Sequence, residues 1–407
     1  MPALAVWGLN WWRRAAATMF LRNRRLPGGM ILGAAVLGLA ANRAETQEVS
    51  PAAPAAKSQS VPAIPNQASP ELKQRPPVTA EEKAAVGRMR LDVVVTDKSG
   101  NPVAGLDAKD FSLQDEGKPQ TIATFQALEG KALGGKAADG TQVNPDSRVS
   151  VFLVMDTVNS GLVDLSFMRD EVEKFLQQNG GQLPQPTTVL LFTDAGFETV
   201  GETSQDGNKL ADAVHAIKPQ VHTIHSAAGR EALVERYQLS GKALAAIAAR
   251  EATAPGRKMM IWIGPGWPIL RATDMNYSAH EHELNYDAIA SLLNQLREGR
   301  MVLCSAGGGS AFAVQDLMTP VRSPMEATAA NLALQVLALE SGGRTLEAGN
   351  RSRPGKQLNA CMQELGAYYT LTFKPPAGKA FAYHALKVSV AKHGLKVNTT
   401  AGYYAEP

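Results

Sequence analysis

The sequence predicts an α/β fold, in which a doubly wound, mostly parallel sheet is inserted into a small β-sandwich. Several short apolar runs show no alternation of polar and apolar residues, which is typical of strands covered on both faces. Segments with apolar residues at helical spacing separate these runs, as in a parallel sheet with crossover helices. Alternating strands without helices between them occur on either side of this region, and they predict the sandwich.

Residues 1–44 have the pattern of an export signal. Five arginines precede an apolar run over residues 30–41, and small residues follow as far as Ala44. This order is typical of a secretory signal peptide, here cut near Ala44. The run is shorter than the roughly 20 residues of a spanning helix, and an uncleaved anchor with its positive end in the cytoplasm is the alternative. We therefore expect an exported protein that is periplasmic, secreted or membrane-anchored at the cell envelope.

Two further segments precede the α/β region. Residues 45–85 are rich in Pro, Ala, Ser and Gln and predict a disordered tether. Residues 86–128 contain alternating apolar residues and turns at 97–102 and 115–119, which indicate short strands of a β-sandwich. Three or four strands are marginal by themselves, so we expect them to pair with strands from elsewhere. Residues 129–147, rich in Gly, Ala and Lys, are predicted to be a linker.

Residues 148–366 form the predicted α/β domain. Its central strand, 150–156, is followed by buried strands at 188–192, 258–263 and 301–304 and by a short strand at 344–346. Segments with apolar residues at helical spacing lie between these strands and after the last one, at 165–175, 210–217, 233–247, 289–296, 332–339 and 358–365. Asn179–Gly181 ends the first helix, and Asp194–Gly196 turns the second strand into an antiparallel hairpin. Gly241 is a candidate break in the third helix.

The last segment, 367–407, returns to an alternating pattern. Apolar residues alternate over 369–373 and 386–390, and His393–Gly394 turns into a further short strand at 395–397. No helical segment separates these strands. We therefore expect them to complete the sandwich begun at 86–128, with the α/β domain inserted between its two parts.

The composition describes a globular chain, with 44% hydrophobic residues, 19% charged residues and a net charge of +3. No long basic face stands out, so we expect no nucleic-acid partner. The only cysteines are Cys304 and Cys361. An exported protein can pair them, but a fold of this size does not need a disulfide, and two buried thiols are the preferred interpretation.

Motifs on both sides of the α/β region carry a family resemblance. Residues 93–106 read VVVTDKSGNPVAGL, 115–120 read DEGKPQ, 369–376 read YTLTFKPP and 401–404 read AGYY. With the elements between them, residues 88–404 resemble the VWFA-related (von Willebrand factor type A domain) family that is abundant in acidobacteria. The resemblance implies a Rossmann-like domain that presents its binding loops at the carboxyl ends of the parallel strands.

A domains of this kind typically bind ligands through a metal at that edge. The pattern that the resemblance implies is Asp-x-Ser-x-Ser after the first strand, a Thr in a second loop and an Asp after the fourth strand, a set of oxygens that suits Mg²⁺. Asp156 and Ser160 match the first motif, whereas Val158, Lys242 and either Gly264 or Pro265 stand at the other positions. We therefore expect a degenerate metal-ion-dependent adhesion site that functions without a cofactor.

The loops at this edge supply the candidate ligand-binding residues. The Lys242 ammonium is expected to lie near Asp156 and to neutralise it as a fixed cation. Trp267 is a contact residue if it is exposed and otherwise packs over the end of the sheet. If Mg²⁺ did bind, its ligands would be Asp156, Ser160 and Asp194, although a turn is the simpler role for Asp194. The ligand-binding candidates are Asp156, Thr157, Ser160, Lys242, Gly264 and Trp267.

The sequence shows no catalytic motif. The histidines at 215, 222 and 225 lack zinc-site spacing, and 280–282 is not a His-Glu-x-x-His motif. Neither a nucleophile elbow nor a nucleophile with its base is evident. We expect a non-enzymatic interaction or adhesion module with an unknown protein or peptide ligand, held near the envelope or membrane by its N-terminus. The alternatives are a hydrolase-type enzyme that uses the same strand-end cleft and a purely structural envelope assembly protein.

Overall fold

The computed structural model of the protein describes residues 87–129, 148–218, 229–271, 275–308, 311–347 and 354–406, all within one compact unit. The predictions for 1–44 and 45–85, for most of the linker and for His222 and His225 lie outside these residues. Within the described ranges, no helix combines the length and the apolar character that a membrane span requires.

A six-stranded sheet forms the centre of the α/β part. It is parallel except for β7, which pairs with β6 as an antiparallel hairpin. The strand order starts from β5 in the middle and winds outward in both directions, which is the doubly wound arrangement that the apolar runs predict. In spatial order, the strands are β10 (Arg344–Glu347), β9 (Met301–Gly308), β8 (Arg257–Ile263), β5 (Val149–Asp156), β6 (Gln182–Thr193) and β7 (Gly196–Asp206).

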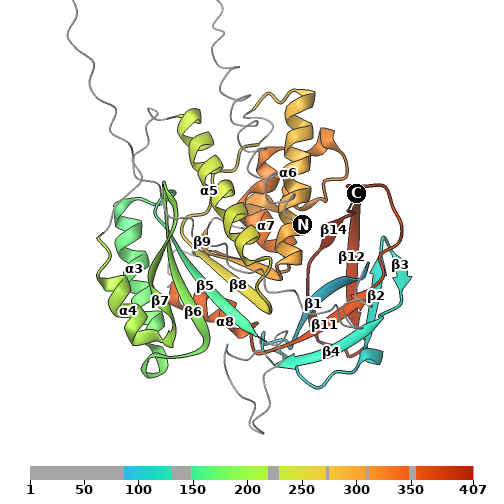
Figure 1. Ribbon diagram of the computed structural model, residues 1–407, viewed down its shortest axis with the longest axis horizontal. Helices are drawn as coiled ribbons and strands as arrows, with labels where there is room; N and C mark the ends of the chain where they lie inside the picture. Colours follow the sequence, from blue (N-terminus) through green and yellow to red (C-terminus); the bar gives the residue numbers. More distant parts are fainter. Residues whose placement is uncertain are drawn as a thin grey trace, which may run out of the picture. The chain divides into compact units, whose positions relative to one another are not determined.

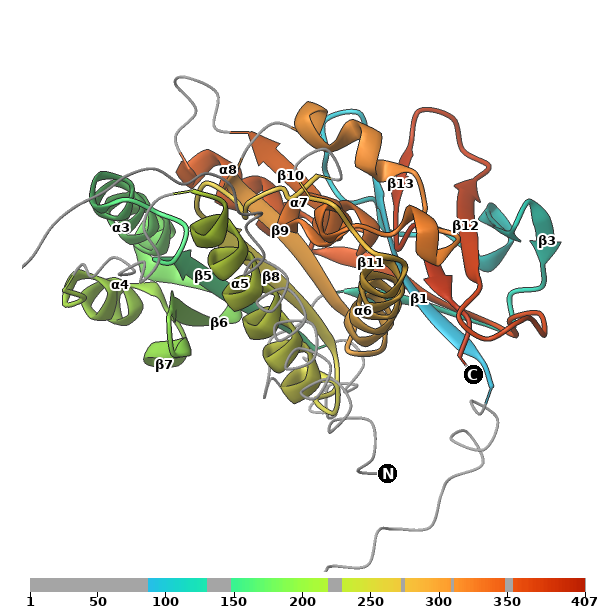
Figure 2. The ribbon, with the colours of Figure 1, turned by 90° about the horizontal axis from the view of Figure 1, so that it is seen from above.

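Helices cover both faces of this sheet (Figures 1 and 2). One face packs against α5 (Arg230–Glu251), α6 (Ala279–Glu298) and α7 (Leu334–Glu340). The other packs against α3 (Leu162–Leu176), α4 (Gly207–His215) and α8 (Pro354–Gln363). Short 3₁₀ helices connect the elements: η1 (Ala108–Asp110), η3 (Gln178–Gly181), η4 (Ala311–Met318), η5 (Pro324–Glu326) and η6 (Ala329–Leu332).

Local signals explain where the helices end. Helix α3 stops before Asn179 and Gly180, which have φ of 52° and 72° in the left-handed region. Helix α5, by contrast, runs unbroken through Gly241, so the predicted break there is wrong. A glycine inside a helix costs only about 1 kcal/mol, and Gly241 is buried beside Ala243 and Leu244 of the core, whose packing offsets that cost.

The strands before and after the α/β part interleave in two four-stranded sheets, with the orders β13-β1-β11-β4 and β14-β12-β2-β3. Strand β1 pairs with β11 and β13, and β2 pairs with β12, all antiparallel. Side chains from both sheets form one core, which confirms the expected sandwich. The strands are β1 (Met89–Thr96), β2 (Phe111–Asp115), β3 (Lys118–Gln120), β4 (Thr124–Glu129), β11 (Ala367–Phe373), β12 (Tyr383–Val390), β13 (Lys396–Asn398) and β14 (Gly402–Tyr404).

Cys304 and Cys361 form a disulfide that links β9 to α8. The preference for two buried thiols is therefore wrong. Both side chains are fully buried on the face of the sheet that α8 covers, with their Cα atoms 6.2 Å apart. Such a pairing depends on the position of α8 over β9, which no local pattern in the sequence reveals.

Candidate functional site

The carboxyl edge of the sheet is organised around Asp156, the last residue of β5. Strand β5 lies between β6 and β8, so its end is near the middle of this edge. The turn that follows, 157–161, leads directly into α3. The main chain and the hydroxyl of Thr157 both donate to the carbonyl oxygen of Phe192 in β6, at 3.1 and 2.6 Å, and these bonds fix the turn to the neighbouring strand.

The Asp156 carboxylate is fully buried and accepts four hydrogen bonds. Its Oδ1 accepts from the main-chain N–H groups of Val158 and Asn159, at 3.1 and 2.9 Å. Its Oδ2 accepts from Asn159 Nδ2 and from Trp262 Nε1, both at 2.8 Å. Burial raises the pKa of Asp156, and the Trp262 and Asn159 donors oppose that rise because they stabilise the ionised form. Neutral donors therefore hold this carboxylate.

The residue of α5 that faces this turn is Ser240 and not Lys242. Asn159 Nδ2 donates to Ser240 Oγ at 3.0 Å, and Ser240 is fully buried. Lys242 lies on an exposed side of the helix. Among the described ion pairs, none joins Lys242 to Asp156, which corrects the expected neutralisation. Two residues in a helix differ by about 200° in direction, so an offset of two in the assumed register is enough to place the wrong residue at the site.

Gly264, the first residue after β8, packs directly behind the turn. A Cβ at this position would lie 2.9 Å from Asp156 Cβ and 3.6 Å from Ser160 Oγ. Its φ of 156° also disfavours other residues. The close approach leaves no room for the carboxylate that an A domain with a complete metal site carries in this loop. Gly264 thus acts here through its small size.

The residues around Asp156 do not fit a Mg²⁺ site. Both Asp156 oxygens already accept N–H donors, and an N–H pointing at an oxygen occupies the position that a cation would take. Ser160 Oγ and Asn159 Oδ1 are buried without a hydrogen-bond partner among the described residues, but two neutral oxygens are a weak set for a hard divalent ion. Asp194 is exposed in the β6–β7 turn, and within the part of the chain that the structure covers no three acidic, His or Cys side chains group as a metal site.

Trp267 is only 3% exposed, so it is not the exposed contact residue that its loop suggests. It packs edge-on against Trp262, with ring centroids 5.0 Å apart. The Trp262 ring also packs against the rings of Phe192 and Phe197, with centroid distances of 5.2 and 5.7 Å. Trp262, which these rings hold in place, donates to the fully buried Asp156 carboxylate. The packing alternative for Trp267 is therefore the arrangement found.

Sequence reasoning missed three residues of this site: Asn159, Ser240 and Trp262. Asn159 had a local signal. An aspartate such as Asp156 typically accepts hydrogen bonds from the main chain two and three residues later, and Asn159 is the third residue after it. Trp262 reads as a core residue from its apolar run, and only the pairing of β5 with β8 brings its N–H to Asp156. Ser240 carried no local signal.

Exposed apolar residues lie beside this rigid turn. In the first two turns of α3, Leu162, Val163 and Phe167 are 56%, 83% and 52% exposed, and Leu233 near the start of α5 is 40% exposed. Ser240 contacts the turn, so the ten residues of α5 that precede it, 230–239, extend beyond the turn for about 15 Å. The edge is thus bordered by exposed apolar side chains on α3 and on α5.

No protein-family model matches the chain, and no curated protein matches it. Solved structures do: the vWF domain of the type V pili tip protein Mfa5 from Porphyromonas gingivalis (16% identity, 29% of this chain and 38% of that one, TM-score 0.20), the SpRpn10 VWA domain (9%, 54% and 97%, 0.27) and the human COPII-coat protein Sec24c (8%, 69% and 46%, 0.28). In its sheet order and its flanking motifs, the chain resembles von Willebrand A domains. Our chain spans 38% of the first match and 26% of a three-domain structure of the same pilus protein.

Proposed function

We propose that the chain is an exported, non-enzymatic interaction module that binds a protein or peptide through the carboxyl edge of its A-like domain. The observation that carries this proposal is the exposure of Leu162, Val163 and Phe167 at the start of α3, next to the Asp156 turn. Apolar side chains that gather on a surface mark interaction sites. Helix α3 has a complete buried face of its own, so these three residues are not needed for folding.

The turn beside this surface is preorganised. The four hydrogen bonds to Asp156 and the Thr157 bonds to β6 fix the backbone from which α3 starts. A surface that is already ordered loses less conformational entropy on binding, which favours affinity. The partner is therefore recognised by a rigid face and not by a flexible loop.

We further propose that binding does not depend on a metal or on catalysis. Neutral donors saturate the Asp156 oxygens, which argues against a bridging cation. The Ser160 hydroxyl lies at the edge, and in the described structure its Oγ has no hydrogen-bond partner, so it lacks the base that activates a nucleophilic serine. Export, adhesion and proximity to the cell envelope remain proposals that rest on the N-terminal sequence, with residues 45–85 as the tether.

The test is a comparison of surface variants of the full-length chain. We would immobilise the wild type and the double variant Val163→Glu/Phe167→Ser, incubate each with cell-envelope extract and quantify the retained proteins by mass spectrometry. The matched control is Met325→Glu, because Met325 is 67% exposed but lies in η5, away from α3. Melting curves confirm that all variants fold.

We expect the double variant to lose at least one specifically retained protein that Met325→Glu keeps, with the same result in EDTA. The binding of that protein, once purified, should weaken at least tenfold, since removing two exposed apolar anchors costs roughly 2 kcal/mol or more. If both variants retain the same proteins as the wild type, the α3 surface is not the binding site, and a structural assembly role is favoured. If EDTA releases the partner, the metal-independent mechanism is wrong.

A further inference from the structure

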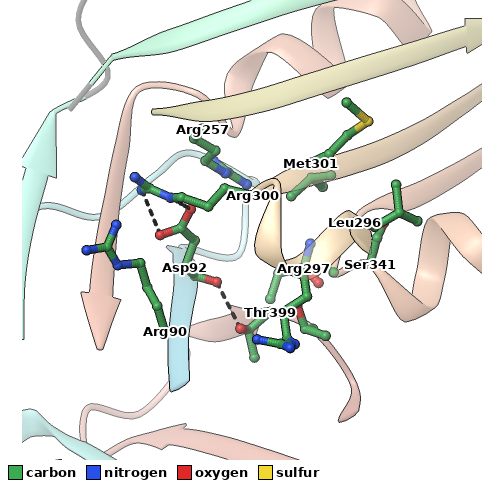
Figure 3. A pocket seen from close by; sticks show the side chains of 13 residues that line it. Arg90, Asp92, Arg257, Leu296, Arg297, Arg300, Met301, Ser341 and Thr399 are labelled. Atoms are coloured by element: carbon green, nitrogen blue, oxygen red, sulfur yellow. Dashed lines mark hydrogen bonds and ion pairs between the residues drawn. The ribbon is translucent and has the colours of Figure 1, made fainter. Parts of the chain in front are cut away.

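A polar cavity lies at the opposite edge of the central sheet, where β8 and β9 begin (Figure 3). Strand β1 supplies Arg90 and Asp92, the first residue of β8 is Arg257, and the end of α6 and the following turn supply Arg297 and Arg300. Asn398, the last residue of β13, and residues 399–400 after it also line the cavity. Four arginines and one carboxylate thus line a cavity between the α/β part and the sandwich strands.

Asp92, the single carboxylate that lines the cavity, already accepts hydrogen bonds from other residues. Asp92 accepts from Arg300 Nε and Nη2, both at 2.9 Å, and also from Thr370 Oγ1 at 2.9 Å. The Asp92 and Arg300 side chains are each 8% exposed. This bidentate pair neutralises Arg300, so Asp92 is not available to compensate the charge of Arg257.

Arg257 carries the argument. It is 2% exposed, and in the described part of the chain it forms no ion pair. One guanidinium nitrogen, Nη1, donates to the carbonyl oxygen of Glu364 at 2.9 Å, and the group lies 5.3 Å from the centre of the Tyr368 ring. Its Nε is buried without a hydrogen-bond partner. A buried charge is costly unless an opposite charge accompanies it, so this guanidinium lacks an anion.

Arg297 and Lys258 add to the positive charge. Arg297 is 9% exposed, and its Nη2 lies 3.2 Å from Glu298 and 3.5 Å from Glu406, but its buried Nε has no partner. Glu406 is 71% exposed, so its carboxylate can leave for water at little cost. Lys258, next to Arg257, is buried and donates to the carbonyl oxygens of Ala254 and Gly299.

We propose that this cavity binds a small tetrahedral oxyanion, a phosphate or sulfate group, through Arg257, Arg297 and Arg90. The three arginines line one cavity from three different elements. Donors from several directions suit a tetrahedral anion better than a planar carboxylate. The cavity has a volume of about 20 Å³, which suits a small group of atoms. Arg90, on the exposed side of β1, forms the rim through which the anion enters. This site is independent of the proposed binding edge.

The experiment is calorimetric titration of the full-length chain with inorganic phosphate, at constant ionic strength set by chloride. Further titrations use sulfate, acetate and phenyl phosphate. We expect saturable binding of phosphate and sulfate, with acetate at least tenfold weaker because it engages fewer donors. If inorganic phosphate binds and phenyl phosphate does not, the ligand is a free ion. If both bind, the ligand is an esterified phosphate that the rim accommodates.

The variants separate this site from general surface charge. Arg90→Gln, at the exposed rim, and Arg297→Gln should each weaken phosphate binding about tenfold or more, since each removes a charged hydrogen bond. Arg250→Gln is the matched control, because Arg250 is an exposed arginine of α5 that pairs with Glu251. Glu406→Gln should tighten binding, because it removes the anion that competes for Arg297.

Absence of saturable phosphate heat in the wild type would overturn the proposal and show that the arginines are compensated within the protein. Equal affinities for phosphate in Arg90→Gln, Arg297→Gln and the control would overturn the assignment to this cavity. Acetate binding as tight as phosphate binding would overturn the tetrahedral specificity. Because Arg90 is exposed, its variant keeps the test decisive if Arg297→Gln fails to fold.

Discussion

Replacing Asp156 with alanine tests the central claim about the carboxyl edge. The substitution removes the acceptor of four N–H groups. Asn159 Nδ2 keeps Ser240 as a partner, so three donors are left unpaired: the buried Val158 N and Trp262 Nε1 and the partly buried Asn159 N. Each unpaired donor costs about 1–3 kcal/mol, and relief from burying the carboxylate offsets part of that cost.

We therefore expect Asp156→Ala to lower the free energy of unfolding by about 3–5 kcal/mol. For a domain of this size, that loss lowers the melting midpoint by roughly 6–20 °C. The assay is thermal and urea unfolding of the full-length chain in EDTA and, separately, in Mg²⁺. The matched control is Asp212→Ala, an exposed aspartate of α4, which should change stability by no more than about 0.5 kcal/mol.

Two results would refute this reasoning. A loss below about 1 kcal/mol would mean that the four hydrogen bonds do not organise the edge. A rise of the wild-type midpoint with Mg²⁺ that Asp156→Ala abolishes would mean that the site holds a metal. A ligand that binds only the folded state stabilises it by about 2.7 kcal/mol at 100 times its dissociation constant, which unfolding curves resolve.

Three further predictions concern stability. Replacing Cys304 and Cys361 with alanine should lower the free energy of unfolding by about 4 kcal/mol, because the disulfide closes a loop across 57 positions. A reductant should destabilise the wild type equally and leave the variant unchanged. A loss below about 1 kcal/mol would contradict the entropic account of the disulfide. Burial raises the pKa of Glu340 from 4.5 to about 7, so stability should fall by about 3 kcal/mol as the pH rises through that interval. Urea titrations at pH 4.5 and 7.5 measure this fall, and Glu340→Gln should remove it. Gly264→Ala should destabilise the protein by about 1–3 kcal/mol more than Gly229→Ala. Both glycines have positive φ, but only Gly264 lacks space for a Cβ. Equal melting midpoints of the two variants would show that the Asp156 turn can move away from the added methyl group.

The sequence determined the elements whose signals are local. Uninterrupted apolar runs located the central strands, and alternation located the sandwich strands, because side-chain direction repeats every two residues in a strand. The Asn179–Gly181 stop and the Asp194–Gly196 hairpin were correct, since left-handed and turn conformations select these residue types. Asp156 was correctly placed at the carboxyl edge, because the apolar run ends there and parallel sheets present polar groups at that edge.

Only the tertiary structure decided which side chains meet. The choice between Ser240 and Lys242 depends on the rotation of α5, and the Trp262 bond to Asp156 depends on β8 being the neighbour of β5. The burial of Trp267 and the disulfide depend in the same way on distant elements that pack together. The arginine cavity is the clearest case, because β1 lies far from β8 and α6 in the sequence. Periodicity fixes the direction of a side chain within its own element, whereas the group opposite to it is set by strand order and helix packing, which are properties of the whole chain.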